Sequence, residues 1–325
     1  LVSDTRKAPP ATLGAPSVKT QVIHFLNRPM PGNLPKRTSR GLLDIEDDTV
    51  IPVIRNPQKT TEESDAVFYF PGCGSERLFS QVGLATQAML YEVGATTVLP
   101  PGYLCCGYPQ TAAGEEDKGQ KITIDNRVLF HRVANTLNYL DIKTVIVSCG
   151  TCMDQLQKYQ FEKIFPGCRL LDIHEYLMEK GVKLEGVEGT RYMYHDPCHT
   201  PMKAYNPLAV TNKLMGQNVP LTDRCCGDSG SFAYSRPDIA TQVKFRKQQD
   251  IEQQAEKLRA DGFKGDVKIL TSCPACLQGL SRYDDDADTQ ADYIVVEMAK
   301  HLLGDNWMAD YVGKANSGGI ERVLL

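Results

Sequence analysis

The sequence lacks the features that mark membrane, secreted and nucleic-acid-binding proteins. Its 325 residues contain no apolar run near the roughly 18–20 residues that cross a bilayer. The start of the chain is polar and rich in proline, so no secretory signal peptide is visible. Lysine and arginine do not gather in one block and the formal net charge is −4, which argues against a nucleic-acid partner. We therefore expect a cytoplasmic protein without a transmembrane segment, and leave open a place at the inner face of the membrane.

A nucleotide-binding signature is also missing. No G-x-G-x-x-G motif follows a predicted strand, so the sequence shows no flavin or nicotinamide site. The remaining composition is ordinary for a globular protein, with 42% hydrophobic and 23% charged residues, and the length suggests about two domains. Because the chain begins at Leu1 rather than at a methionine, we expect it to be a piece of a longer protein.

Eleven cysteines set the sequence apart from an average chain. Without a secretory signal we expect a reducing compartment, in which cysteines at regular spacing indicate metal ligands or redox groups rather than disulfides.

The first 64 residues differ from the rest. They hold eight of the 19 prolines and no cysteine, and only Val22–Leu26 is apolar enough to dock. We interpret residues 1–64 as a linker or an extended arm lying on the body; a disordered tail explains the composition equally well.

From Asp65 onward, short runs rich in β-branched and aromatic residues alternate with longer helical stretches. The predicted strands are Ala66–Phe70, Thr97–Leu99, Thr144–Val147, Leu170–Ile173, Tyr192–Tyr194 and Val267–Leu270. The predicted helices are Ser75–Val93, Glu115–Leu140, Pro207–Met215, Pro237–Ala260 and Ala291–Leu303. This alternation predicts an α/β fold made of βαβ units with mainly parallel sheets.

Ten of the cysteines belong to an internal repeat. Each copy reads Cys, then Cys-Cys-Gly, then Cys-x-x-Cys, and matching members lie 125, 120, 120, 124 and 124 residues apart. The flanks repeat as well, since FYFPGC matches YMYHDPC and VIVSCGTC matches ILTSCPAC. We therefore predict two similar domains in a pseudo-twofold tandem repeat, 65–185 and 186–325. The first set is Cys73, Cys105, Cys106, Cys149 and Cys152, and the second is Cys198, Cys225, Cys226, Cys273 and Cys276.

The position of these cysteines predicts that they gather. Cys73, Cys149, Cys198 and Cys273 each follow a predicted strand, and ligands of open parallel sheets collect at the carboxyl ends of the strands. Each set should therefore lie at one sheet edge, and the two sets should approach each other.

Four kinds of site are compatible with such sets. Disulfides fit poorly, because adjacent cysteines seldom bond each other without strain. Zinc takes four ligands, commonly from two Cys-x-x-Cys knuckles, whereas each set has one knuckle among five thiols. A bare dithiol would leave three thiols per set unused. An iron–sulfur cluster needs four thiolates, and the fifth thiol either bridges two irons in a non-cubane cluster or is a bystander.

The doubled arrangement resembles the CCG cysteine-rich domain family, over residues 65–305. That family includes the B subunit of heterodisulfide reductase, the iron–sulfur subunit of glycolate oxidase and the iron–sulfur protein of lactate-utilisation operons. It also includes the C-terminal part of FAD-linked oxidases of the D-lactate dehydrogenase type, to which the stretches NRPMPGNLPKRT and HDPCHTPMK are most similar.

The resemblance implies two [4Fe–4S] clusters, one on each set of five cysteines, with the choice between cubane and non-cubane open. It implies iron–sulfur electron transfer within an oxidoreductase that oxidises a 2-hydroxy acid, with the FAD on a flavoprotein domain or subunit and a ferredoxin-like segment as a further partner. Two alternatives are a catalytic module that reduces a disulfide, as in heterodisulfide reductase, and a zinc-stabilised structural or docking module.

Other residues have two interpretations each. His195 and His199 are candidates for a proton donor beside a cluster, or they bond the backbone while Asp196 caps the next helix. Asp228 either lowers a cluster's potential or forms a turn.

For several further side chains we expect a structural role and no part in the chemistry. The charged residues of 237–260 are expected on a solvated face, Cys168 as a small buried residue, and the tyrosines near the sets as packing residues. These are Lys244, Arg246, Lys247, Glu252 and Glu256 for the face, and Tyr103, Tyr108 and Tyr234 for the packing.

Overall fold

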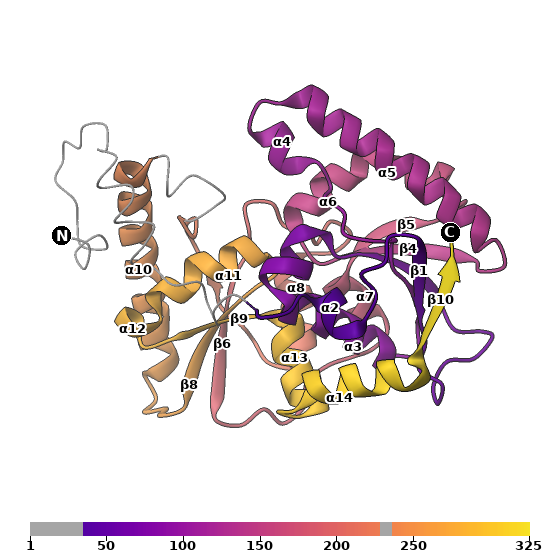
Figure 1. Cartoon of the computed structure of the whole chain (residues 1–325). Coiled ribbons are helices and arrows are strands. Elements are labelled where there is room, and N and C mark those ends of the chain that lie inside the picture. Colours follow the sequence, from indigo (N-terminus) through magenta and orange to yellow (C-terminus); the bar gives the residue numbers. More distant parts are fainter. Residues whose placement is uncertain (1–34, 228–235) are drawn as a thin grey trace.

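A computed structural model of the chain describes residues 35–227 and 236–325. It shows an α/β fold with two sheets, one in each half of Figure 1. The fold class predicted from the alternating pattern is thereby confirmed. Val22–Leu26, Asp228 and Tyr234 lie outside the described residues.

The first sheet has six strands. Its order is β10 (Ile320–Leu324), β1 (Val50–Ile54), β3 (Thr96–Val98), β2 (Ala66–Phe70), β4 (Ile142–Val147) and β5 (Arg169–Asp172). Strands β3, β2, β4 and β5 run parallel, whereas β1 is antiparallel to both of its neighbours.

The second sheet has four strands, all parallel. Its order is β7 (Leu221–Thr222), β6 (Thr190–His195), β8 (Asp266–Thr271) and β9 (Gln290–Tyr293). The strands β2, β4, β6 and β8, which precede the cysteines, therefore occupy matching places in the two sheets.

Helices connect the strands and cover the sheets. They are α2 (Ser39–Leu43), α3 (Ser80–Glu92), α4 (Tyr108–Ala112), α5 (Glu116–Thr136), α6 (Gly150–Leu156), α7 (Ile173–Glu179), α8 (Pro207–Met215), α10 (Pro237–Arg259), α11 (Pro274–Leu280), α12 (Asp284–Ala287), α13 (Ile294–Leu303) and α14 (Trp307–Lys314). Among the described residues, none of these is both long enough and apolar enough to cross a membrane.

Alternating side chains give each sheet two buried faces. Tyr69 and Tyr194, from β2 and β6, belong to one large core that both sheets share with helices α3 and α13. Phe68 and Phe70 point to the other face of the first sheet, beneath α5. Met193 does the same in the second sheet, beneath α10. The shared core holds the two repeats against each other.

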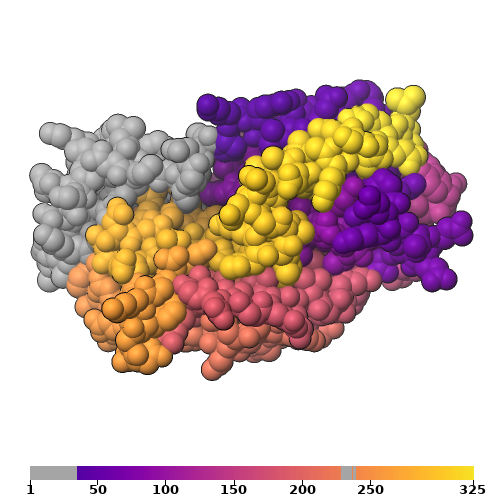
Figure 2. All heavy atoms as spheres, turned by 90° about the horizontal axis from the view of Figure 1, so that it is seen from below, coloured from indigo at the N-terminus to yellow at the C-terminus, as the bar shows by residue number. Residues whose placement is uncertain are grey.

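Segments from both ends of the chain complete the first sheet. Strand β1 and helix α2 come from the described part of residues 1–64, and β10 comes from the far end of the second repeat. In Figure 2 the C-terminal segment runs from the orange second half onto the indigo first half. The helix predicted over 291–303 begins only at Ile294, because Gln290–Tyr293 pairs with β8 as an edge strand.

Candidate metal centre

The cysteines of both repeats lie at the carboxyl ends of the strands, as the sequence predicts. Cys73 follows β2 and Cys198 follows β6, while Cys149 and Cys273 come two residues after the ends of β4 and β8. The vicinal pairs follow the neighbouring strands β3 and β7. The parallel sheets thus place all ten thiols at two matching edges.

The five thiols of the first set form a continuous chain of contacts. Cys105 interacts with Cys73 and Cys106, Cys106 interacts with Cys152, and Cys152 interacts with Cys149. The thiols of Cys106 and Cys73 lower the pKa of Cys105 to about 2, and the Cys105 sulfur in turn raises the pKa of Cys106 to about 12. The sulfur of Cys105 is therefore the one that ionises first, and it accepts hydrogen bonds from the neighbouring thiols of Cys73 and Cys106.

The second set repeats this arrangement. Its sulfurs lie 3.9 Å apart between Cys198 and Cys225, and 3.6 Å apart between Cys226 and Cys276. Cys225 also interacts with Cys226, and Cys276 with Cys273. Contact with the thiols of Cys225 and then Cys276 holds the pKa of Cys226 well below its ordinary value.

The two sets meet between their knuckles. The thiols of Cys149 and Cys273 interact, so all ten sulfurs form one connected group. Next to this contact, the carbonyl oxygens of Ser148 (2.7 Å) and Ser272 (2.8 Å) share the single proton of the Tyr293 hydroxyl as acceptors. The predicted approach of the two sets is seen in the structure.

The backbone around the sets is repeated too. Cys149 and Cys273 are the N-cap residues of α6 and α11. The thiols of Cys152 and then Cys273 hold the pKa of Cys149 well below its ordinary value, and the main-chain N–H of Cys152 acts in the same direction. Gly107 and Gly227 adopt φ values of 90° and 74° directly after the vicinal pairs, a conformation that a side chain disfavours. The tight turns let both sulfurs of each pair face the site.

The donor set suits a soft metal. Each site offers five sulfurs, and all eleven cysteines are free thiols in the structure. Thiolates select iron–sulfur clusters or zinc, and metal binding displaces the protons that these thiols now share. The residues therefore fit the two implied clusters. That each set of five holds a [4Fe–4S] cluster stays a prediction.

His195 ends strand β6 and is 1% exposed, and neither ring nitrogen makes a hydrogen bond of regular geometry among the described residues. The ring does interact with the Cys226 thiol, which adds to the lowering of the Cys226 pKa by Cys225 and Cys276. One of its ring nitrogens lies within 4.8 Å of the sulfurs of Cys226 and Cys276. In the first repeat the matching residue is Phe70, which belongs to the same buried hydrophobic cluster as Cys106 and Cys152. The backbone hydrogen bond predicted for His195 is thus not made within the described part of the chain, and the ring faces the second set.

His199 lies at the boundary between the repeats. Its Nδ1 bonds Asp154 (2.5 Å) and its Nε2 lies 3.1 Å from the Tyr108 hydroxyl, while Lys203 also contacts Asp154 (3.0 Å). The histidine therefore bonds side chains rather than the backbone. Asp196 caps no described helix; it accepts a hydrogen bond from Tyr194 (3.0 Å).

Two tyrosines beside the sets were missed by the sequence reasoning. The hydroxyl of Tyr159 donates a hydrogen bond to the carbonyl oxygen of Cys106 (2.9 Å). In the same way, the hydroxyl of Tyr283 donates to the carbonyl oxygen of Cys226 (3.1 Å). Both tyrosines come seven residues after the last cysteine of their knuckle. This spacing, repeated in both copies, is the signal that would have found them.

The remaining predictions have mixed outcomes. Lys244 and Lys247 are buried on the inner side of α10, so the prediction of a solvated face is wrong for them. Cys168 packs at the edge of the outer core, where burial raises its pKa to about 11. Tyr103 bonds Glu46 (2.6 Å) rather than packing against a set.

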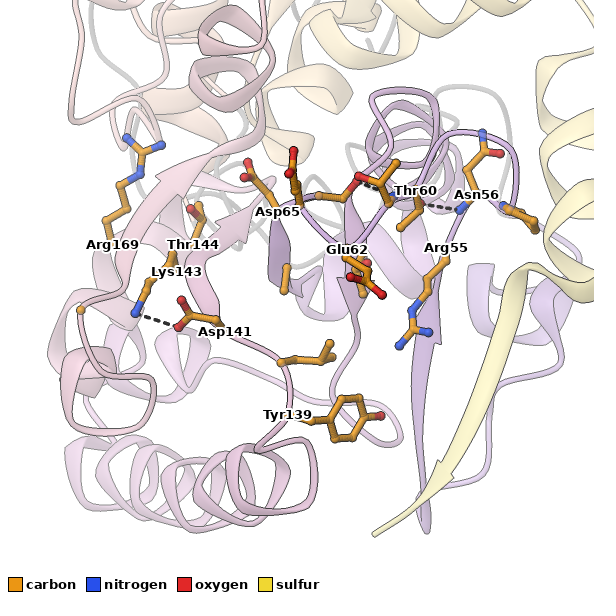
Figure 3. Close-up of a pocket in the computed structure, with 18 residues that line it drawn as sticks. Arg55, Asn56, Thr60, Glu62, Asp65, Tyr139, Asp141, Lys143, Thr144 and Arg169 are labelled. Carbon is orange, nitrogen blue, oxygen red and sulfur yellow. Dashed lines mark hydrogen bonds and ion pairs between the residues drawn. The ribbon is translucent and has the colours of Figure 1, made fainter.

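A groove lies at the ends of the first sheet's strands that are opposite to the cysteines. This groove, of about 1120 Å³, is bordered by the first residues of β2 and β3, by Lys143 and Thr144 of β4, and by the loop of 55–65 (Figure 3). Several of its charged side chains are paired, including Lys143 with Asp141 (2.7 Å). It does not reach the cysteines.

Comparisons with known proteins match both repeats. The family described as cysteine-rich domain (CCG) matches residues 67–157 and 192–281, and a domain of unknown function (DUF3400) matches 281–325. An uncharacterised iron–sulfur protein of Methanococcus maripaludis is 24% identical over 75% of this chain and 45% of its own length.

Two further relatives bear functional names. The B subunit of the fumarate reductase (CoM/CoB) of Methanothermobacter marburgensis is 27% identical over 64% of this chain and 40% of its own. A probable glycolate oxidase iron–sulfur subunit of Bacillus subtilis is 23% identical over 65% and 48%. The chain thus spans less than half the length of these curated relatives.

Proposed function

This chain belongs to the cysteine-rich (CCG) domain family, and from that premise we propose that it is the iron–sulfur electron-transfer module of an oxidoreductase. The observation that carries the proposal is the contact between Cys149 and Cys273, which joins two matched sets of five thiols into one group. Two redox centres in such contact suit electron exchange within the module.

The donor of these electrons would be a flavoprotein that oxidises a 2-hydroxy acid. In support, the probable glycolate oxidase subunit is a relative, and this chain shows no dinucleotide fingerprint of its own. The first set would hold one cluster and the second set the other, each supplying one-electron redox chemistry. The protein's own contribution is to hold the sulfurs, through the tight turns after the vicinal pairs and the tyrosine bonds to Cys106 and Cys226.

The test is an assay of the purified, anaerobically prepared module. With glycolate or D-lactate and a dye acceptor the module alone should reduce no dye, and adding the flavoprotein domain should start substrate-dependent reduction. Dye reduction by the module alone would overturn the electron-transfer role.

A second candidate function is disulfide reduction at one of the sets. Two observations favour it: Cys73 and Cys198 are exposed, so a second reactant can reach both sets, and the CoM/CoB fumarate reductase subunit is a relative. Under this function, the module with a chemical electron donor should reduce a small disulfide without any flavoprotein.

Zinc is a third candidate for the second set alone. His195, Cys226 and Cys276 offer three ligand atoms within 4.8 Å of one another, a set that zinc accepts. Zinc protein would be colourless, whereas iron–sulfur protein absorbs broadly in the visible range. Metal analysis of the anaerobic preparation therefore separates the zinc candidate from the two iron–sulfur candidates.

A further inference from the structure

The surroundings of the two cysteine sets differ at three matched positions. The match follows from shared contacts, since Gly107 packs against Ile122 as Gly227 packs against Val243. It pairs first-repeat residues that carry no charge with second-repeat residues that are histidine or lysine. The pairs are Phe70 with His195, Thr123 with Lys244, and Asn126 with Lys247.

His195 is the most direct of these differences. Its ring is buried against Cys226 and Cys276, with no hydrogen-bond partner elsewhere among the described residues. A buried ring N–H without a partner is costly, and the sulfurs of the second set are the acceptors within reach. Phe70, which takes this place in the first repeat, has no donor to offer.

The lysines add positive charge behind the second set. Lys247 is fully buried, and its ammonium donates to Thr222 (2.7 Å) and to the carbonyl oxygen of Asp223, two residues before Cys225. Asp250, 3.2 Å from the ammonium, offsets part of this charge. The matching Asn126 is neutral and bonds the carbonyl oxygen of Cys105 (2.8 Å).

Lys244 strengthens the same asymmetry. It is 3% exposed, and its side chain packs so closely on Gly227 that a Cβ atom there would lie 2.8 Å from the lysine Cγ. The first part of its side chain therefore lies on the inner side of α10, next to the turn that follows Cys226. Thr123, its counterpart, is neutral and bonds the carbonyl oxygen of Gly119 (3.1 Å).

We propose that His195, supported by Lys247, gives a cluster held by the second cysteine set a higher reduction potential than one held by the first. Hydrogen bonds to the sulfurs and positive charge both stabilise the reduced, more negative state of a cluster. If one electron entered the module, it would then reside on the cluster held by the second set, and the cluster held by the first set would stay oxidised. This inference rests on the proposed electron-transfer function.

The test is a potentiometric titration of anaerobic protein, followed by electron paramagnetic resonance at one fixed pH. The wild type should show two centres of different potential. In His195→Phe the upper potential should fall by the equivalent of at least tenfold in the redox equilibrium, or about 59 mV for one electron. Lys247→Asn should shift the same centre in the same direction, with the iron content of both variants unchanged.

The first repeat supplies the matched control. Phe70→Leu offers no donor and should move neither potential, whereas Phe70→His should raise the lower one. Two centres of equal potential, or an upper potential that His195→Phe and Lys247→Asn leave in place, would overturn this inference alone. Iron-free protein would overturn the proposed function and this inference together.

Discussion

The main-chain carbonyl oxygen of His199 lies directly against the α-carbon of Gly150, and a Cβ atom at Gly150 would collide with it. Gly150 lies between the two cysteines of the first knuckle, and His199 directly follows the first cysteine of the second repeat. The mirrored contact places Pro274, from the second knuckle, 4.0 Å from the Cβ position of Gly74. Each repeat thus presses the turn after its first cysteine onto the knuckle of the other.

Gly150→Ala should therefore damage both packing and metal binding. The added methyl group meets backbone, which cannot rotate away, so the knuckle or the 198–200 turn must shift. Overpacking of this kind costs about 1–3 kcal/mol or more. We expect a lower melting temperature and less iron per chain, measured by thermal unfolding and metal analysis of anaerobic protein.

Gly313→Ala is the matched control for that substitution. Gly313 lies in helix α14, has no atom within 4 Å of its Cβ position among the described residues and has no positive φ. Alanine should stabilise the helix by about 0.5–1 kcal/mol. If Gly150→Ala melted no lower than the wild type, the close contact between the repeats would be refuted.

The ligand assignment can be tested with three single substitutions. Cys168 has no counterpart in the repeat, and its pKa responds to burial, Glu162 and Lys143 rather than to another thiol, so Cys168→Ser should leave iron and sulfide unchanged. Cys149→Ser and Cys273→Ser each remove a sulfur from the contact between the sets, and each should lower the iron content and the sulfide content. Loss of a whole cluster in Cys168→Ser would show that the ligands are wrongly assigned.

Tyr293 joins the two repeats through one hydroxyl group. In Tyr293→Phe the carbonyl oxygens of Ser148 and Ser272 both lose this donor inside the core. An unsatisfied buried group costs about 1–3 kcal/mol, so we expect a clear loss of stability in denaturant unfolding. Tyr139, which is 59% exposed, gives the control, because Tyr139→Phe should change stability little. Equal unfolding midpoints for the two variants would contradict the bridging role.

Much of this arrangement could be predicted from the sequence. Strand β2 and helix α8 have the predicted bounds, and the cysteines lie where strand ends and the repeat place them. Local periodicity and a doubled motif are strong signals, because each is written in neighbouring residues. The grouping of the ten sulfurs follows from those two signals alone.

Other features depend on contacts between distant parts of the chain. Proline is unusual within a strand, yet Pro52 lies in β1, which pairs with β3 only through Val53 and Ile54 and with β10 from the other end of the chain. Lys244 and Lys247 resemble an exposed face in sequence, and only the packing of α10 onto the second sheet buries them. Such burial has no local signature.

Glu76 gives a prediction about pH. It lies three residues after Cys73, is 1% exposed and pairs with Arg40 of helix α2, which also bonds the carbonyl oxygen of Pro100 (2.8 Å). Burial raises the pKa of Glu76 from 4.5 to about 7, although Arg40 acts in the opposite direction. The folded protein thus favours the protonated acid more than the unfolded chain does.

The sign of the effect follows from this shift. A raised folded pKa contributes stability that is complete below about pH 4.5 and is lost as the pH rises through 7. Glu76→Gln mimics the protonated acid at every pH, so its stability relative to the wild type should rise between pH 5 and 8, by at most about 3 kcal/mol. The ion pair with Arg40 exists only for the ionised carboxylate, so its effect is already contained in this folded pKa. Only the difference between glutamine and the protonated acid adds an offset that does not vary with pH. Glu321→Gln, at an exposed site paired with Arg55, should show no such slope in the same unfolding series, and a flat difference for Glu76→Gln would mean that Arg40 keeps the carboxylate charged throughout.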